Sequence, residues 1–182
     1  FTEDVDLIVN VITQSDWRQM QKKLRHRGFK EDMSADVICR MNLANLIVDV
    51  MPIGERILGF SNQWYKAAMA HPLLYEVKPD LTVKIISSVY FIATKIDAYL
   101  SRGQGDVLAS HDVEDLLTVF DGRSSIVNEI IQAEPQVRQY IIDQLNMLLD
   151  NEYFEYAIQG VARGDMAREQ LIMDRIQACI EI

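Results

Sequence analysis

The stretch TEDVDLIV, residues 2–9, joins an acidic beginning to an apolar run. Asp4 and Asp6 stand at its start, and apolar residues continue almost without interruption to Ile12. The many β-branched residues from Val5 to Ile12 predict a buried strand. Because residues two apart on a strand point to the same side, the two aspartates should project together, with the odd-numbered apolar residues on the opposite side.

A third acid, Asp49, is embedded in LIVDVMP, residues 46–52. A lone carboxylate in an apolar strand costs free energy unless it has a partner. Neighbouring acids also raise each other's pKa unless a cation neutralises them, and Mg²⁺ takes oxygen ligands of this kind. If the two strands are neighbours, Asp4, Asp6 and Asp49 predict a site for Mg²⁺ or Mn²⁺. The alternative is that the acids at residues 4 and 6 are simply solvated at the end of a sheet.

The amino-acid composition limits which classes of protein are compatible with this sequence. The chain has 182 residues, of which 49% are hydrophobic, enough for a substantial core. Its 18 basic and 27 acidic residues give a formal charge of −9, which argues against binding nucleic acid by bulk charge, although a local basic patch is compatible with it. The two cysteines, Cys39 and Cys179, are far apart, which favours a reduced protein. We see neither a membrane span nor a signal peptide and expect a cytoplasmic protein with no membrane partner.

The first half of the chain alternates strand and helix signals. After the first strand, Ser15 or Asp16 is a candidate cap for a helix that carries apolar residues at helical spacing and ends at Gly28. Two strands, Val37–Met41 and Leu46–Met51, should form a hairpin around a polar turn containing Asn42 and Asn45, with Pro52 ending the second. A further strand is expected from Leu81 to about Ile86.

The second half has helical periodicity throughout. One helix begins near Val89 and should stop at Gly103, and Ser110 and Gly122 bound the next. Pro135 suits the first turn of a later helix. The remaining helices are expected at about 124–134, 135–149, 152–162 and 165–180. We therefore expect an α/β protein: a mixed sheet core over residues 1–86, a helical lobe over 87–182, and an active site between them.

Several motifs together resemble the nucleotidyltransferase superfamily with a DNA polymerase β-like core. These are the acidic pair DVDL, the helix ending in RGF and the third acid in VDVMP. The stretches TEDVDLIV, GERILGFSNQWYKAA, FIATKIDAYLSRGQGDVLASHDVEDL and DGRSSIVNEI look like the AbiEii branch, which includes toxins of type IV toxin–antitoxin systems. The similarity extends to about Glu134.

The resemblance implies roles for residues that match the motifs. Asp4 and Asp6 would be paired metal ligands, and Asp49 a third ligand that also helps to deprotonate the attacking hydroxyl. Lys95 would face the nucleotide phosphates, and Asp112 would be the catalytic helical aspartate. Two further residues, Arg102 and Asp115, are candidate companions of this lysine and aspartate.

Helical spacing is consistent with these roles but also allows plainer ones. Lys95 and Arg102 share a helix face apart from the apolar stripe, so both could contact one anion. A solvated lysine is the alternative. Acids near a helix N-terminus, such as Asp112, are favoured by the helix dipole alone, and Asp112 could instead pair with Lys95 or Arg102 and position it. Arg40 could contact a phosphate or the target, but we interpret it as an arginine on an edge strand and leave it outside the site.

The implied reaction is metal-dependent transfer of a nucleoside monophosphate from an NTP to a hydroxyl. A tRNA 3' end is one implied acceptor and an antitoxin protein an implied partner; a small-molecule hydroxyl is the alternative acceptor. The superfamily's glycine motif lies before the acidic pair and is not in this sequence, where Phe1 is three positions before Asp4. We therefore expect a longer natural protein with that motif upstream. A degenerate homologue that binds a nucleotide or a partner without turnover is the other alternative.

Overall fold

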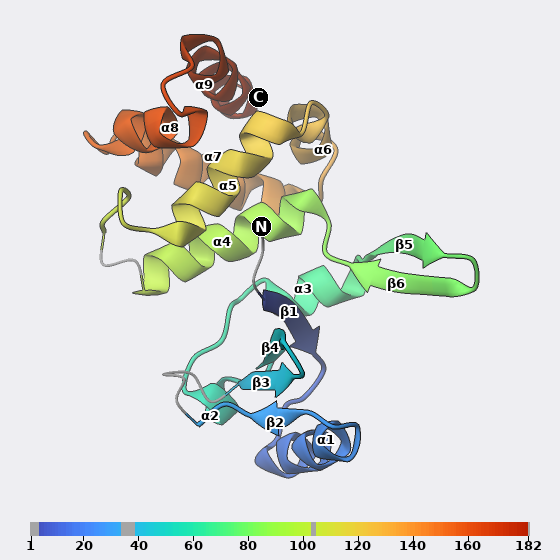
Figure 1. The fold of residues 1–182 in the computed structure, drawn as a ribbon. Coiled ribbons are helices and arrows are strands. Elements are labelled where there is room, and N and C mark those ends of the chain that lie inside the picture. Colours follow the sequence, from blue (N-terminus) through green and yellow to red (C-terminus); the bar gives the residue numbers. More distant parts are fainter. Residues whose placement is uncertain (1–3, 34–38, 103–104, 182) are drawn as a thin grey trace. The chain divides into compact units, whose positions relative to one another are not determined.

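The computed structural model describes residues 4–33, 39–102 and 105–181 (Figure 1). Contacts divide the chain into two compact units, residues 1–69 and 70–182. The first contains a four-stranded mixed sheet with helices, and the second contains a two-stranded sheet and a set of helices. The α/β class with a mixed sheet is therefore confirmed.

The sheet of the first unit has the strand order β1-β4-β3-β2. Strand β1 runs parallel to β4, whereas β3 is antiparallel to both β4 and β2. The predicted hairpin is thus present, although Asn42 lies within β3 and the turn is formed by Ala44, with φ 53°, and Asn45. Residues 37 and 38 of its expected first strand lie outside the described residues. The strands are β1 (Asp4–Val9), β2 (Lys30–Glu31), β3 (Arg40–Leu43) and β4 (Leu46–Pro52).

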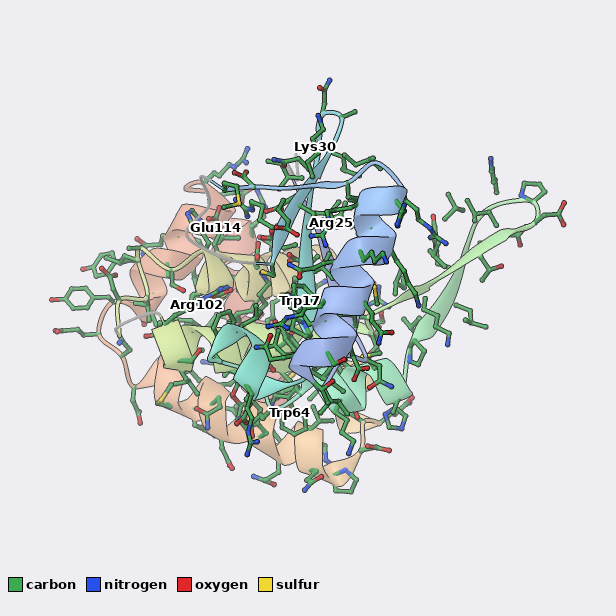
Figure 2. All side chains as sticks on the ribbon, turned by 90° about the horizontal axis from the view of Figure 1, so that it is seen from below. Trp17, Arg25, Lys30, Trp64, Arg102 and Glu114 are labelled. Carbon is green, nitrogen blue, oxygen red and sulfur yellow. The ribbon has the colours of Figure 1, made fainter. Side chains whose placement is uncertain are left out.

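Helix α1 (Gln14–His26) covers the apolar face of this sheet. Its N-cap is Thr13 rather than Ser15 or Asp16: the Thr13 hydroxyl accepts a hydrogen bond from the Asp16 amide at 3.1 Å. Trp17, labelled on α1 in Figure 2, is buried with residues of β3 and β4. The core members are Val11, Trp17, Cys39, Met41, Val48, Val50 and Ile57.

Strand β1 is shorter and less buried than expected. It ends at Val9, and Val5 and Leu7 remain 41% and 42% exposed because β1 is an edge strand of the sheet. Beyond its end the chain passes close to Gly54, where an added Cβ would lie 2.5 Å from the Ile12 carbonyl oxygen. Only glycine permits this approach. The close contact holds the segment after β1 against the start of the short helix α2 (Glu55–Leu58), which precedes α3 (Tyr65–Ala70).

The expected strand beginning at Leu81 exists but does not join the main sheet. It is β6 (Leu81–Ile85), paired antiparallel with β5 (Leu73–Lys78), a strand that the sequence analysis missed. The two form a hairpin assigned by contacts to the second unit. The division by contacts therefore falls at residue 69, whereas the sequence predicts a boundary at 86.

Helices with buried apolar stripes make up the rest of the second unit. Helix α5 packs against α4, α8 and α9 around residues such as Ile96, Leu116 and Phe120. The Ser110 hydroxyl caps α5 and Pro135 opens α7, as expected, whereas the predicted stop of α4 at Gly103 lies outside the described residues. No helix in the described part of the chain is long and apolar enough to cross a membrane. The helices are α4 (Ser88–Arg102), α5 (His111–Gly122), α6 (Ile126–Ile131), α7 (Pro135–Leu149), α8 (Phe154–Ala162) and α9 (Met166–Ile180).

Candidate active site

The three strand acids lie on one face of the first unit's sheet. Asp6 and Asp49 are register partners in the neighbouring parallel strands β1 and β4, and Asp4 precedes Asp6 by two positions. Partners in register project to the same side, as do residues two apart. The opposite face carries Val48 and Val50, which are buried in the core. The pleat thus separates an acidic face from an apolar one.

Arg40 holds this acidic face together. It is the register partner of Asp49 in the antiparallel pair of β3 and β4. Its Nε donates to Asp49 Oδ1 at 2.9 Å and its Nη2 to Asp49 Oδ2 at 2.7 Å. The same Nη2 lies 3.4 Å from Asp4 Oδ2. The Asp49 side chain is 13% exposed, so the two-pronged contact supplies the partner that a nearly buried carboxylate needs.

The electrostatics follow from this contact. The hydrogen bond with Asp49 raises the pKa of the Arg40 guanidinium above its ordinary value. The charges of Asp49 and Asp4 add to this rise. Burial raises the pKa of the neighbouring Cys39 thiol, and the Asp49 charge adds to that rise. The thiol therefore stays protonated near neutral pH, which argues against Cys39 as a nucleophile.

The interpretation of Arg40 as an arginine on an edge strand was wrong. Strand β3 has neighbours on both sides in the sheet, so Arg40 is not on an edge strand, and its side chain contacts two of the three candidate metal ligands. The sequence contained a usable signal: Arg40 and Asp49 lie on the two expected strands of one hairpin. A cross-strand pair of opposite charges is a common way to stabilise a sheet.

The second group of candidates lies on α4 and α5 in the second unit. The Arg102 guanidinium donates from Nε to Asp112 Oδ2 at 3.0 Å and from Nη2 to Asp112 Oδ1 at 2.9 Å. Lys95 Nζ lies 3.6 Å from Asp112 Oδ1 and 2.5 Å from Asp115 Oδ2. It also lies 5.5 Å from the centroid of the Phe91 ring, a cation–π contact.

Burial distinguishes the members of this α4–α5 cluster, which consists of Lys95, Arg102, Asp112 and Asp115. The Asp112 side chain is 8% exposed and that of Lys95 19%, whereas Arg102, labelled in Figure 2, is 65% exposed. Asp112 therefore sits beneath two cations and positions both. Asp112 thus pairs with both Lys95 and Arg102, an alternative that the helical spacing allowed. Both cations already have carboxylate partners.

The acidic face is organised by an arginine and not as a ready-made metal site. Among residues 4–33, 39–102 and 105–181, no three His, Cys, Asp or Glu side chains are arranged as a site that could hold a metal ion. The donor chemistry of the three strand acids suits a hard divalent cation, but their present arrangement is organised around Arg40. Occupation by an ion would require the guanidinium to give up at least part of its contact.

The chain was also compared with known proteins. No protein-family model matches it, and no curated protein is significantly similar to it.

Proposed function

We propose that the chain is a metal-dependent nucleotidyltransferase that moves a nucleoside monophosphate from an NTP to a hydroxyl acceptor, with pyrophosphate leaving. The observation that supports this best is the register of β1 and β4, in which Asp6 lies beside Asp49 and Asp4, two positions before Asp6, lies on the same face. Phosphoryl-type transfer requires carboxylates so placed to hold cations against a triphosphate.

In this proposal Asp4, Asp6 and Asp49 would hold Mg²⁺ or Mn²⁺. A divalent cation there would neutralise the negative charge of the triphosphate. Asp49 is the least exposed of the three acids. In the proposal it also accepts the proton of the attacking hydroxyl. Arg40, displaced from the acids by the cation, is a donor for a phosphate oxygen, since guanidinium groups bind carboxylate and phosphate in the same geometry.

Lys95 and Arg102 contribute the second part of the proposal. Two cations over one nearly buried acid form a preorganised group that could transfer its hydrogen bonds to a phosphate. The same proposal includes a tRNA 3' end as the acceptor, with a small-molecule hydroxyl as the alternative. It also includes an antitoxin protein as partner and a cytoplasmic location. They rest on the resemblance of the motifs to the AbiEii branch.

A second candidate is favoured by Arg40 itself. The guanidinium already neutralises Asp49 and contacts Asp4, so these two acids can be retained without any metal ion. This is what a homologue that binds a nucleotide or a partner protein without turnover would need. A binding protein without turnover can therefore also embed Asp49 in a strand, because Arg40 supplies the partner of this carboxylate.

Calorimetry separates the two candidates. The chain is titrated with MnCl₂ alone and with a non-hydrolysable NTP analogue in the presence of Mn²⁺. The enzyme proposal expects weak binding of the metal alone and tighter binding with nucleotide, because Mg²⁺-type sites use few carboxylates plus substrate phosphates. Asp49→Asn should weaken the metal-dependent binding about tenfold or more, whereas Asp16→Asn on α1 should not.

Incubation with each labelled NTP, with bulk RNA or without it, then tests turnover. Label appearing in RNA supports a polynucleotide acceptor. Nucleotide binding that does not depend on the metal, without transfer to any acceptor, supports the second candidate. Metal and nucleotide binding that is unchanged by Asp49→Asn would contradict both the shared site and the enzyme proposal.

A further inference from the structure

The β5–β6 hairpin exposes an amphipathic surface. The register pairs Leu73 with Ile85 and Tyr75 with Val83 on one face. On the other face Leu74 pairs with Lys84 and Glu76 with Thr82. The side chains of the apolar face are largely exposed: Tyr75 is 56% exposed and Ile85 40%. A two-stranded hairpin is only marginally stable by itself, so a surface of this kind favours association.

The two edges of this hairpin differ. Strand β5 has an extra residue between Glu76 and Lys78, which interrupts its register. Bulges of this type make a strand edge unsuitable for pairing with another chain. Strand β6 is regular from Leu81 to Ile85 and, among the described residues, β5 is its strand neighbour in a sheet of two. The edge of β6 is therefore the one suited to take a further strand.

The sequence of β6, LTVKI, matches a second copy of itself. In an antiparallel pair centred on Val83, Leu81 of each copy faces Ile85 of the other, and the two Val83 side chains face each other. On the opposite face Thr82 meets Lys84 of the second copy, so no like charges meet. Pairing of apolar residues without charge repulsion is the condition for stable cross-strand contacts.

We infer that the β6 edge is a homodimer interface, in which two hairpins join through antiparallel β6 strands into a four-stranded sheet. The surface is independent of the proposed enzymatic function. Three or more strands are the usual requirement for a stable sheet, and the joined hairpins meet it.

A charge exchange in the full chain tests this pairing by analytical ultracentrifugation over a wide concentration range. The unaltered chain should shift from a mass of 20.9 kDa toward twice that value as concentration rises. Thr82→Lys should weaken the dimer about tenfold, because two new lysine–lysine pairs form across the interface. Within one hairpin the new lysine faces Glu76, so the hairpin itself is not destabilised.

The double variant Thr82→Lys/Lys84→Glu should restore the dimer, since each new lysine then faces a glutamate of the other copy. Thr118→Lys, which adds the same charge at an exposed position of α5, should leave association unchanged. A monomer at every concentration would overturn the inference. So would a dimer that Thr82→Lys leaves unaffected, or one that the double variant fails to restore.

Discussion

Arg40 is the residue on which the acidic face depends, because it neutralises Asp49 and reaches Asp4 from a third strand. Removing one member of a buried charge pair leaves the other without compensation. Arg40→Met should therefore lower the free energy of unfolding by about 1–3 kcal/mol. This cost is smaller than for a fully buried pair because the Arg40 side chain is partly exposed to solvent. Urea denaturation measures it.

Arg25→Met is the matched control, since it removes an ion pair with Glu31 in which Arg25 is 52% exposed, and it should cost less than about 1 kcal/mol. Mg²⁺ adds a second readout. If the acids can hold an ion, Mg²⁺ should raise the melting temperature of Arg40→Met more than that of the unaltered chain. A variant as stable as the control would show that Arg40 is not needed to neutralise Asp49.

Gly54 is the second residue whose identity the structure explains. An added Cβ would lie 2.5 Å from the backbone oxygen of Ile12, and a backbone group cannot move as a flexible side chain can. Gly54→Ala should destabilise the first unit by about 1–3 kcal/mol. Gly160→Ala is the control, because nothing lies near that Cβ in α8, and it should stabilise by about 0.5–1 kcal/mol. Equal effects in thermal denaturation would contradict the close approach.

At the scale of elements, the pairing of α4 with α5 depends on Asp112 more than on Asp115. Asp112 is 8% exposed, accepts two hydrogen bonds from Arg102 and forms an ion pair with Lys95, whereas Asp115 is 46% exposed and contacts Lys95. Asp112→Asn should cost about 1–3 kcal/mol, because charge-assisted hydrogen bonds are lost. Asp115→Asn should cost less than about 1 kcal/mol.

Chemical denaturation of the two asparagine variants measures the difference. The reverse order, with Asp115→Asn the more costly, would show that the cluster is organised around Lys95 and not around Asp112. A large loss of NTP binding by Asp112→Asn without a loss of stability would instead support the catalytic role.

At the scale of the molecule, lowering the pH should reduce the stability of the second unit, because Asp121 becomes protonated. The Arg168 guanidinium on α9 donates from Nε to Asp121 Oδ1 on α5 at 3.1 Å, and this contact lowers the pKa of Asp121 below its ordinary value of 3.8. A lowered folded-state pKa contributes stability that is present above the unfolded-state pKa and is lost as the pH falls through the folded-state value.

Asp121→Asn should consequently cost about 1–2 kcal/mol at neutral pH and progressively less below about pH 4. Asp143→Asn is the control, since the exposed Asp143 accepts a bond from Gln139 on its own helix. Denaturant titrations at several pH values test it. A cost that stays constant down to the lowest pH would show that the Asp121 charge does not stabilise the unit.

The sequence by itself determined the elements whose signals are local. The cap at Ser110, the start of α7 at Pro135, the apolar stripes of the long helices and the hairpin of β3 and β4 are encoded within a few residues, so periodicity and turn chemistry predict them. The alternation in β1 likewise predicts that Asp4 and Asp6 share a face. Their proposed role in metal binding stays a prediction.

Only the tertiary structure decided which segments are neighbours. The contact of Arg40 with Asp4 and the approach of Ile12 to Gly54 join residues far apart in the chain, and β6 stays outside the main sheet. The half-exposed start of β1 depends on its edge position, which no local pattern carries. Burial and charge pairing are properties of the folded arrangement, because each depends on which side chains the topology places against one another.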